Sequence, residues 1–108
     1  MAGINPVKLR ILAEAESEIE AAWEYLISQA ARLGARFLDD LEETLDAVTE
    51  RPESFPRLET LPDDSPYRRA LLSIFRYAVV FEIESGEIVV VAVAHTSREP
   101  NYWLDRLQ

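Results

Sequence analysis

The residues best equipped for chemistry follow the last apolar stretch of the chain, in the segment AVAHTSREPNYW (92–103). The segment holds the only histidine, His95, and then Arg98, Tyr102 and Trp103. Arginine makes charge-assisted contacts to phosphate or carboxylate, histidine and tyrosine can transfer protons, and tryptophan offers a stacking surface. His95, Arg98 and Tyr102 are therefore candidates for catalysis, or for contact with a phosphodiester or an acidic partner surface.

Each of these residues also has a structural interpretation. A single histidine at a strand end can serve only as a hydrogen-bonding group, and Tyr102 and Trp103 can pack the end of the chain against a sheet. Trp23 lies on an apolar helical stripe, which places it in the predicted core. Trp103 and Trp23 are accordingly expected to support the structure rather than to bind a ligand.

Charge is distributed unevenly along the 108 residues, which are expected to form one domain, 1–108. The first 65 residues hold six Lys or Arg and fifteen Asp or Glu, and so carry the whole net charge of −9. The remainder is neutral, and its cations are all arginines: Arg68, Arg69, Arg76, Arg98 and Arg106. This balance argues against strong non-specific nucleic-acid binding, which rests on neutralising many phosphates, but it permits a local arginine cluster.

Composition also limits cofactors and location. With no cysteine and one histidine, thiolate and multi-histidine metal sites are excluded. The acidic residues are most simply solvated helix faces, with no spacing that demands a metal: Glu14, Glu16, Glu18, Glu20, Asp39, Asp40, Glu42 and Glu43. We therefore expect no metal and no cofactor. No apolar run reaches the roughly 20 residues that span a bilayer, so a soluble cytoplasmic protein without membrane contact is expected.

Hydrophobic periodicity predicts a strand and two helices in the first half. Residues 6–13 alternate as a short strand. The first helix begins either at the apparent capping box Ser17–Glu20 or one turn earlier near Glu14. Gly34 suits the end of that helix or the turn after it. A second apolar stripe over 37–48 ends before Pro52, so the two helices should pack as an antiparallel hairpin.

Strand character returns after a proline-rich connector, residues 52–66. Residues 68–75, 77–84 and 87–94 are rich in β-branched and aromatic side chains, and Ser85-Gly86 predicts a tight turn between the last two strands. The last strand is apolar on both faces and is expected at the centre of the sheet. The prediction is an α+β fold in the order β-α-α-β-β-β, with a helical hairpin on one face of a small antiparallel sheet and the opposite face open for the arginine-rich site.

The order and spacing of several motifs resemble the RelE/ParE superfamily of toxins from bacterial type II toxin–antitoxin systems. The resemblance covers about residues 12–106 and rests on Arg69 with Ala-Leu-Leu, on Phe75-Arg76-Tyr77 with Ala-Val-Val, and on AVAHTSREPNYW (92–103). Many relatives have Phe-Pro-Tyr where this chain has Phe-Arg-Tyr. The His-x-x-Arg-x-Pro-x-Tyr-Trp ending is similar to the ParE-like branch, whose members are often called plasmid stabilisation proteins.

The resemblance implies a toxin that is neutralised by a cognate antitoxin and that inhibits DNA gyrase without a catalytic step. The residues it points to for target or partner contact are Arg68, Arg69, Arg76, His95, Arg98 and Tyr102. One alternative is a RelE-like, ribosome-dependent mRNA endoribonuclease that needs no metal. There Arg69 and Arg98 would stabilise the cleaved phosphate, and His95 or Tyr102 would transfer protons. The other alternative is a toxin-derived binding module without toxicity. A homodimer is a further partner to consider.

Overall fold

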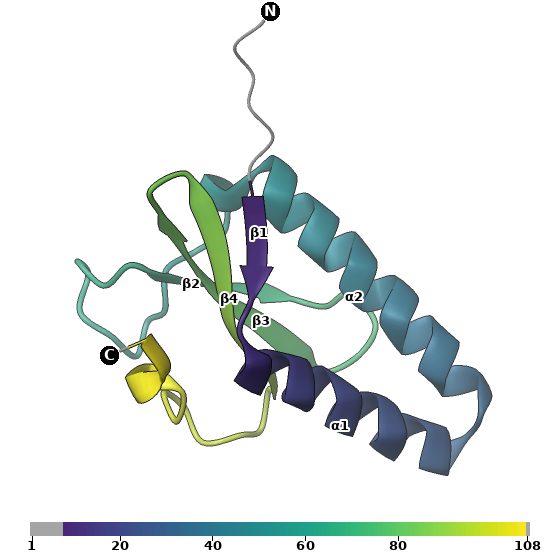
Figure 1. The fold of residues 1–108 in the computed structure, drawn as a ribbon. Helices are drawn as coiled ribbons and strands as arrows, with labels where there is room; N and C mark the ends of the chain where they lie inside the picture. The colour runs from purple at the N-terminus through teal and green to yellow at the C-terminus, as the bar shows by residue number, and fades with distance from the viewer. Residues whose placement is uncertain (1–7, 108) are drawn as a thin grey trace, which may run out of the picture.

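The computed structural model describes residues 8–107, and its elements follow the predicted order (Figure 1). They are β1 (Lys8–Ile11), α1 (Ala13–Gln29), α2 (Arg32–Glu50), the 3-10 turn η1 (Pro52–Ser54), β2 (Tyr67–Leu71), β3 (Tyr77–Glu84), β4 (Glu87–His95) and the 3-10 turn η2 (Leu104–Leu107). The two helices pack on one face of a four-stranded sheet in the order β1-β4-β3-β2. The α+β prediction is confirmed.

The sheet is mixed rather than purely antiparallel, which corrects one part of the prediction. Strands β2, β3 and β4 are antiparallel neighbours, and β1 pairs with β4 in parallel, with Leu9 opposite Ile88. Parallel neighbours need a long crossover connection, which the two helices and the two other strands supply. Ser85 and Gly86 have φ of 52° and 77°, the left-handed values that a tight hairpin turn between β3 and β4 requires.

Helix boundaries differ from the prediction at the hairpin. Helix α1 begins at Ala13, so the earlier of the two expected starts is correct and Ser17 lies inside the helix without capping it. Gly34 lies within α2 and does not terminate α1. A Cβ at Gly34 would lie 2.7 Å from Ile27 Cγ1 and 2.9 Å from Trp23 Nε1, so glycine here allows the two helices to approach closely.

Trp23 does not lie in the core, contrary to the prediction. Its side chain is 36% exposed and covers Gly34 at the outer side of the hairpin. The face of α1 that packs on the sheet is instead lined by small side chains, Ala15 and Ala22, and by Leu26. The small alanine side chains allow α1 to lie close to β4, whereas the larger Trp23 side chain lies at the margin of this interface.

Strand β4 lies between β1 and β3 and is buried on both faces, which confirms its predicted central position. Phe37, Leu41, Val48, Phe81 and Val90 belong to the core under the helices. A second cluster covers the other face of the sheet, where Val89, Val91 and Ala92 contact Trp103. In the β3–β4 pairing Val80 is opposite Ala92 and Phe81 is opposite Val90, so Val91 is an extra residue in β4. This β-bulge interrupts the alternation of faces, and the consecutive residues Val91 and Ala92 therefore both belong to the second cluster.

The expected strand 68–75 ends early, at Leu71, because a buried carboxylate draws the following residues into a turn. Asp40 in α2 is 2% exposed and accepts hydrogen bonds from the backbone N–H groups of Ser73, Ile74 and Phe75, at 3.1, 2.9 and 3.0 Å. Sequence analysis placed Asp40 on a solvated helix face, and that interpretation is wrong. Its partners lie 33 to 35 positions away in the chain, so helical periodicity alone does not indicate them.

Candidate functional site

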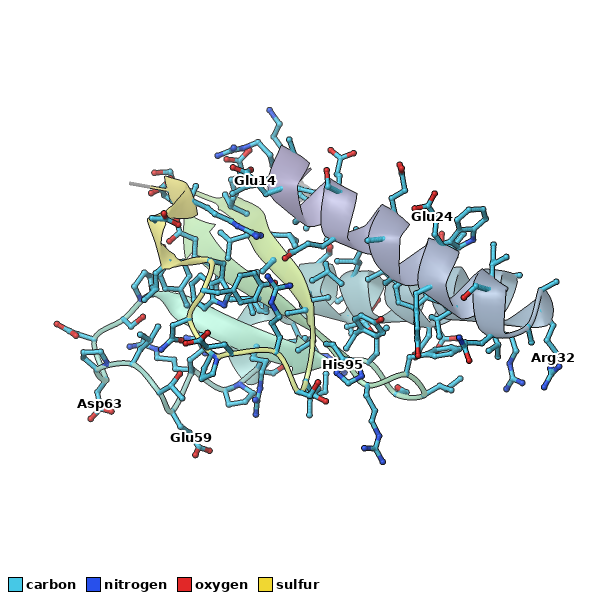
Figure 2. The ribbon with its side chains drawn as sticks, turned by 90° about the horizontal axis from the view of Figure 1, so that it is seen from below. Glu14, Glu24, Arg32, Glu59, Asp63 and His95 are labelled. Carbon is cyan, nitrogen blue, oxygen red and sulfur yellow. The ribbon has the colours of Figure 1, made fainter. Side chains whose placement is uncertain are left out.

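A shallow pocket of about 120 Å³ lies where β4 ends and the C-terminal tail (residues 96–107) begins. The sheet side of this tail pocket includes Arg69 and Val80, and the other wall is built by residues 95 and 98–103. Figure 2 shows His95 at the end of β4, away from the acidic side chains of Glu59 and Asp63 on the connector. The lining combines apolar side chains such as Val80 with two arginines, Arg69 and Arg98, and one acidic residue, Glu99.

His95 is exposed and engaged in a local turn. The backbone N–H of Ser97 donates to His95 Nδ1 at 3.1 Å, and Ser97 Oγ lies 2.7 Å from the same nitrogen. Since Nδ1 accepts a hydrogen bond, the neutral ring carries its proton on Nε2. The ring also packs edge-on against Tyr77, with centroids 5.2 Å apart. His95 therefore has one ring nitrogen left for a partner or substrate.

Arg98 and Tyr102 lie against each other, and Tyr102 is bonded to Glu18 of α1. The Arg98 guanidinium stacks over the Tyr102 ring at 3.9 Å from its centroid. The Tyr102 hydroxyl donates to Glu18 Oε2. Arg106 donates from Nη1 to Glu18 Oε1 at 2.9 Å and from Nη2 to Oε2 at 3.1 Å, which makes a bidentate ion pair.

This arrangement changes the acid–base properties of the tail. Burial of the Tyr102 phenol, followed by its hydrogen bond to Glu18, raises its pKa to about 12. The hydrogen bonds to Glu18 likewise raise the pKa of Arg106. Both groups therefore stay protonated at neutral pH, and the Tyr102 hydroxyl acts as a hydrogen-bond donor to a carboxylate.

The other arginines are distributed over three places. Arg69 lines the tail pocket, next to Val80 across the strand pair. Arg68 points the opposite way, and its Nη1 donates to the carbonyls of Glu53 and Phe55 at 3.3 and 2.7 Å. Arg76 is exposed in the turn before β3, where its carbonyl accepts the N–H of Thr96. Of the predicted contact residues, Arg69, His95, Arg98 and Tyr102 gather at the pocket, whereas Arg68 and Arg76 do not line it.

The sheet face opposite the helices is covered, which corrects the expectation that it would be open. Leu58 and Leu61 of the connector, together with Trp103 and Leu107 of the tail, pack on this face. Trp103 is 4% exposed and packs edge-on against Tyr67 at 4.7 Å between centroids, in agreement with its predicted structural role. The tail pocket lies between the tail and the strand ends on this side of the molecule.

Glu18 is the site residue that sequence analysis missed. It was assigned to a solvated helix face, but it lies between Ala15 and Ala22, two of the buried residues of α1. Ala15, Glu18 and Ala22 follow one another at spacings of three and four residues and so lie on one face of the helix. This spacing in the sequence indicates that Glu18 faces the interior rather than solvent.

Residues 8–107 contain no group of three or more His, Cys, Asp or Glu side chains arranged to hold a metal ion. Within the same residues, neither helix combines the length and the apolar character needed to cross a membrane.

Comparison with known proteins identifies the class to which this fold and site belong. A family model described as the ParE toxin of the type II toxin–antitoxin system parDE matches residues 9–100, and the chain belongs to that family. The predicted resemblance to RelE/ParE toxins is thereby confirmed. A solved structure titled "Chromosomal ParDE TA system from P. aeruginosa" superimposes with a TM-score of 0.72 at 13% identity. The match covers 83% of this chain and 96% of that chain, and at such identity it shows the fold. No curated protein matches the sequence.

Proposed function

We propose that this protein is a cytoplasmic toxin of a plasmid-stabilisation type that binds DNA gyrase, inhibits it without a chemical step and is neutralised by a cognate antitoxin. Membership of the ParE toxin family over residues 9–100 carries this proposal. The solved relative of similar fold is described as a ParDE toxin–antitoxin system, which supports the expectation of an antitoxin partner.

The geometry of the tail pocket favours binding over proton transfer. A ribonuclease without a metal needs a group that exchanges protons near neutral pH. Tyr102 does not meet this requirement, because its pKa is about 12 and its hydroxyl already donates to Glu18. His95 retains one free ring nitrogen but points from an exposed turn. Arg69 and Arg98, in contrast, are exposed cations that line the pocket, and their guanidinium groups suit the carboxylates of a protein target.

Arg98 is the residue on which we place the target contact. It is exposed, its guanidinium is held on the Tyr102 ring, and it lines the tail pocket. Arginine anchors of this kind are enriched among the residues that dominate protein–protein binding energy, and truncating one typically costs a factor of ten or more in affinity.

The test is a supercoiling assay with purified gyrase and purified toxin, together with controlled induction in a bacterial host. We expect inhibition of supercoiling, and in cells a DNA-damage response before translation falls. Arg98→Ala should raise the half-inhibitory concentration on the order of tenfold. The matched control is Arg36→Ala, which removes the same charge from an exposed position on α2. Unchanged supercoiling at excess toxin would reject gyrase as the target.

The same experiment addresses the two alternatives. Early loss of translation with a silent damage reporter, followed by cleavage of mRNA in programmed ribosomes, would favour the endoribonuclease. Undisturbed growth without an antitoxin would favour a binding module that has lost toxicity, for which the net charge of −9 is a supporting observation.

A further inference from the structure

The carboxylate of Glu18 joins three parts of the chain that are remote in sequence. Its Oε1 accepts the backbone N–H of Val93 in β4 at 3.0 Å and Arg106 Nη1 at 2.9 Å. Its Oε2 accepts the Tyr102 hydroxyl and Arg106 Nη2, the latter at 3.1 Å. These partners lie 75 to 88 positions from Glu18, so the carboxylate connects α1 with the central strand and the tail.

The environment of this cluster makes it more than a surface ion pair. The side chains of Glu18 and Arg106 are each only 16% exposed. Arg106 Nη1 also donates to the carbonyl of Val91 at 2.9 Å, so the guanidinium is bound by both α1 and β4. Exposed pairs contribute little because water and salt screen them, whereas a bidentate and largely buried pair is stronger and fixes orientation.

The cluster also determines where Arg98 lies. Arg98 rests on the Tyr102 ring at 3.9 Å from its centroid, and that ring is held in place by its hydroxyl bond to Glu18. Arg98 and His95 line the tail pocket and also a second hollow beside α1, which Glu18 itself lines. A shift of Tyr102 would therefore displace the guanidinium that faces both hollows.

We propose that Glu18 is a positioning residue, whose carboxylate docks the C-terminal tail on α1 and β4 and thereby holds Arg98 over the Tyr102 ring at the tail pocket. Docking of the tail is a property of the folded chain alone. Its consequence for gyrase inhibition rests on the proposed function, and the two are tested by separate measurements.

The main variant is Glu18→Gln, which keeps the size of the side chain but removes its charge. One end of an amide carries hydrogens and cannot accept from Tyr102 or Arg106, so the cluster loses about half of its acceptors. The matched control is Glu20→Gln, which makes the same change at an exposed position on the same helix. If Glu18→Gln fails to fold, Tyr102→Phe takes its place, because it removes only the hydroxyl that bonds to Glu18 and retains the aromatic ring whose position the Arg98 shift reports.

The first measurement follows the tail by NMR in the isolated toxin. The amides of Leu104 and Arg106 donate to the carbonyls of Asn101 and Trp103, so their hydrogen exchange reports on tail docking. We expect Glu18→Gln to accelerate that exchange on the order of 10- to 100-fold, which corresponds to the loss of a charge-assisted hydrogen bond. Apart from Val93, whose amide donates to Glu18 itself, the amides that join β3 to β4 should be unchanged. Arg98 side-chain protons should also lose the upfield shift that the face of an aromatic ring induces. Unchanged tail exchange or an unchanged Arg98 shift would overturn the proposal.

The second measurement is a double-mutant cycle on gyrase inhibition. Glu18→Gln should weaken inhibition about tenfold alone and should add nothing once Arg98 is already alanine, because the two residues act through one contact. Additive effects would mean that Glu18 acts by general destabilisation and would overturn the positioning role. If the unmodified toxin leaves supercoiling intact, the proposed function fails, while the NMR measurements still decide whether Glu18 docks the tail and Arg98.

Discussion

Replacing Asp40 should reveal how strongly the turn between β2 and β3 depends on one buried carboxylate. Asp40 Oδ1 accepts the N–H of Ser73, and Oδ2 accepts those of Ile74 and Phe75. Asp40→Ala removes all three acceptors, whereas Asp40→Asn can keep an oxygen on the Oδ2 side and turns an NH₂ group toward Ser73. The alanine variant should therefore be clearly worse than the asparagine variant.

The magnitudes follow from the number of bonds lost. A hydrogen bond to a charged group contributes about 1.5–3 kcal/mol. Ser73 and Ile74 are exposed residues, so their amides can recover part of the loss by binding water in the variant. We therefore expect a loss of about 3–5 kcal/mol in the free energy of unfolding for Asp40→Ala, and about 1.5–3 kcal/mol for Asp40→Asn. A domain of this size is stable by about 5–15 kcal/mol, so the alanine variant should approach the limit of stability.

Urea unfolding followed by circular dichroism measures these differences. With a slope of about 1.5 kcal/mol per molar urea, Asp40→Ala should lower the midpoint by about 2–3 M without changing the slope. Asp39→Ala, one residue earlier and exposed, is the matched control and should remain within about 0.5 kcal/mol of the unmodified protein. The reasoning is refuted if Asp40→Ala costs less than about 1 kcal/mol, or if the asparagine variant is as damaging as the alanine variant.

Three further changes have defined outcomes. Burial and the hydrogen bond to the carboxylate on α1 raise the pKa of Tyr102 to about 12. The Tyr102 hydroxyl therefore contributes fully to the stability of the fold below pH 10, and this contribution is lost between about pH 10 and 12. After allowance for partial exposure of the side chain, this stabilisation amounts to about 1–2 kcal/mol. It can be measured by comparing the alkaline unfolding of Tyr102→Phe with that of the unmodified protein. Burial raises the pKa of Glu82, so Glu82→Gln should stabilise the protein at pH 7. Thermal unfolding should show that this gain vanishes as pH falls below the ordinary glutamate range. Gly34→Ala gains helix propensity but must displace Ile27 and Trp23, so we expect a net loss of about 1 kcal/mol and altered tryptophan fluorescence.

Most of the fold could be predicted because local patterns determined it. The β-branched residues of 77–84 and 87–94, joined at Ser85-Gly86, define a hairpin whatever surrounds it, and both strands have nearly the predicted bounds. The parallel pairing of β1 could not be predicted in the same way, since a four-residue strand carries no signal of direction. The early end of β2 depends on Asp40, whose partners are remote in sequence.

The candidate site was predicted in composition and only in part in arrangement. Residues 95–103 are close to one another because they are neighbours in sequence. Arg69 joins them because β2 pairs with β3, which lies beside β4. Arg68 and Arg69 are adjacent in sequence, but successive strand residues face opposite sides of a sheet, so only Arg69 reaches the tail pocket. The sequence alone predicts that Arg68 and Arg69 lie on opposite faces of the sheet, but it does not tell which of the two faces the tail.

The role of Tyr102 shows why residue type alone cannot decide chemistry. A tyrosine between an arginine and a tryptophan is equally compatible with a proton donor in catalysis and with a packing group. Its partner decides between them, and that partner is Glu18, 84 positions earlier in the chain. Burial and the hydrogen bond to this carboxylate raise the pKa of Tyr102 to about 12, so at neutral pH the hydroxyl stays protonated and bonded to Glu18. The face of the Tyr102 ring carries the guanidinium of Arg98, which is the group that we propose for contact with the target.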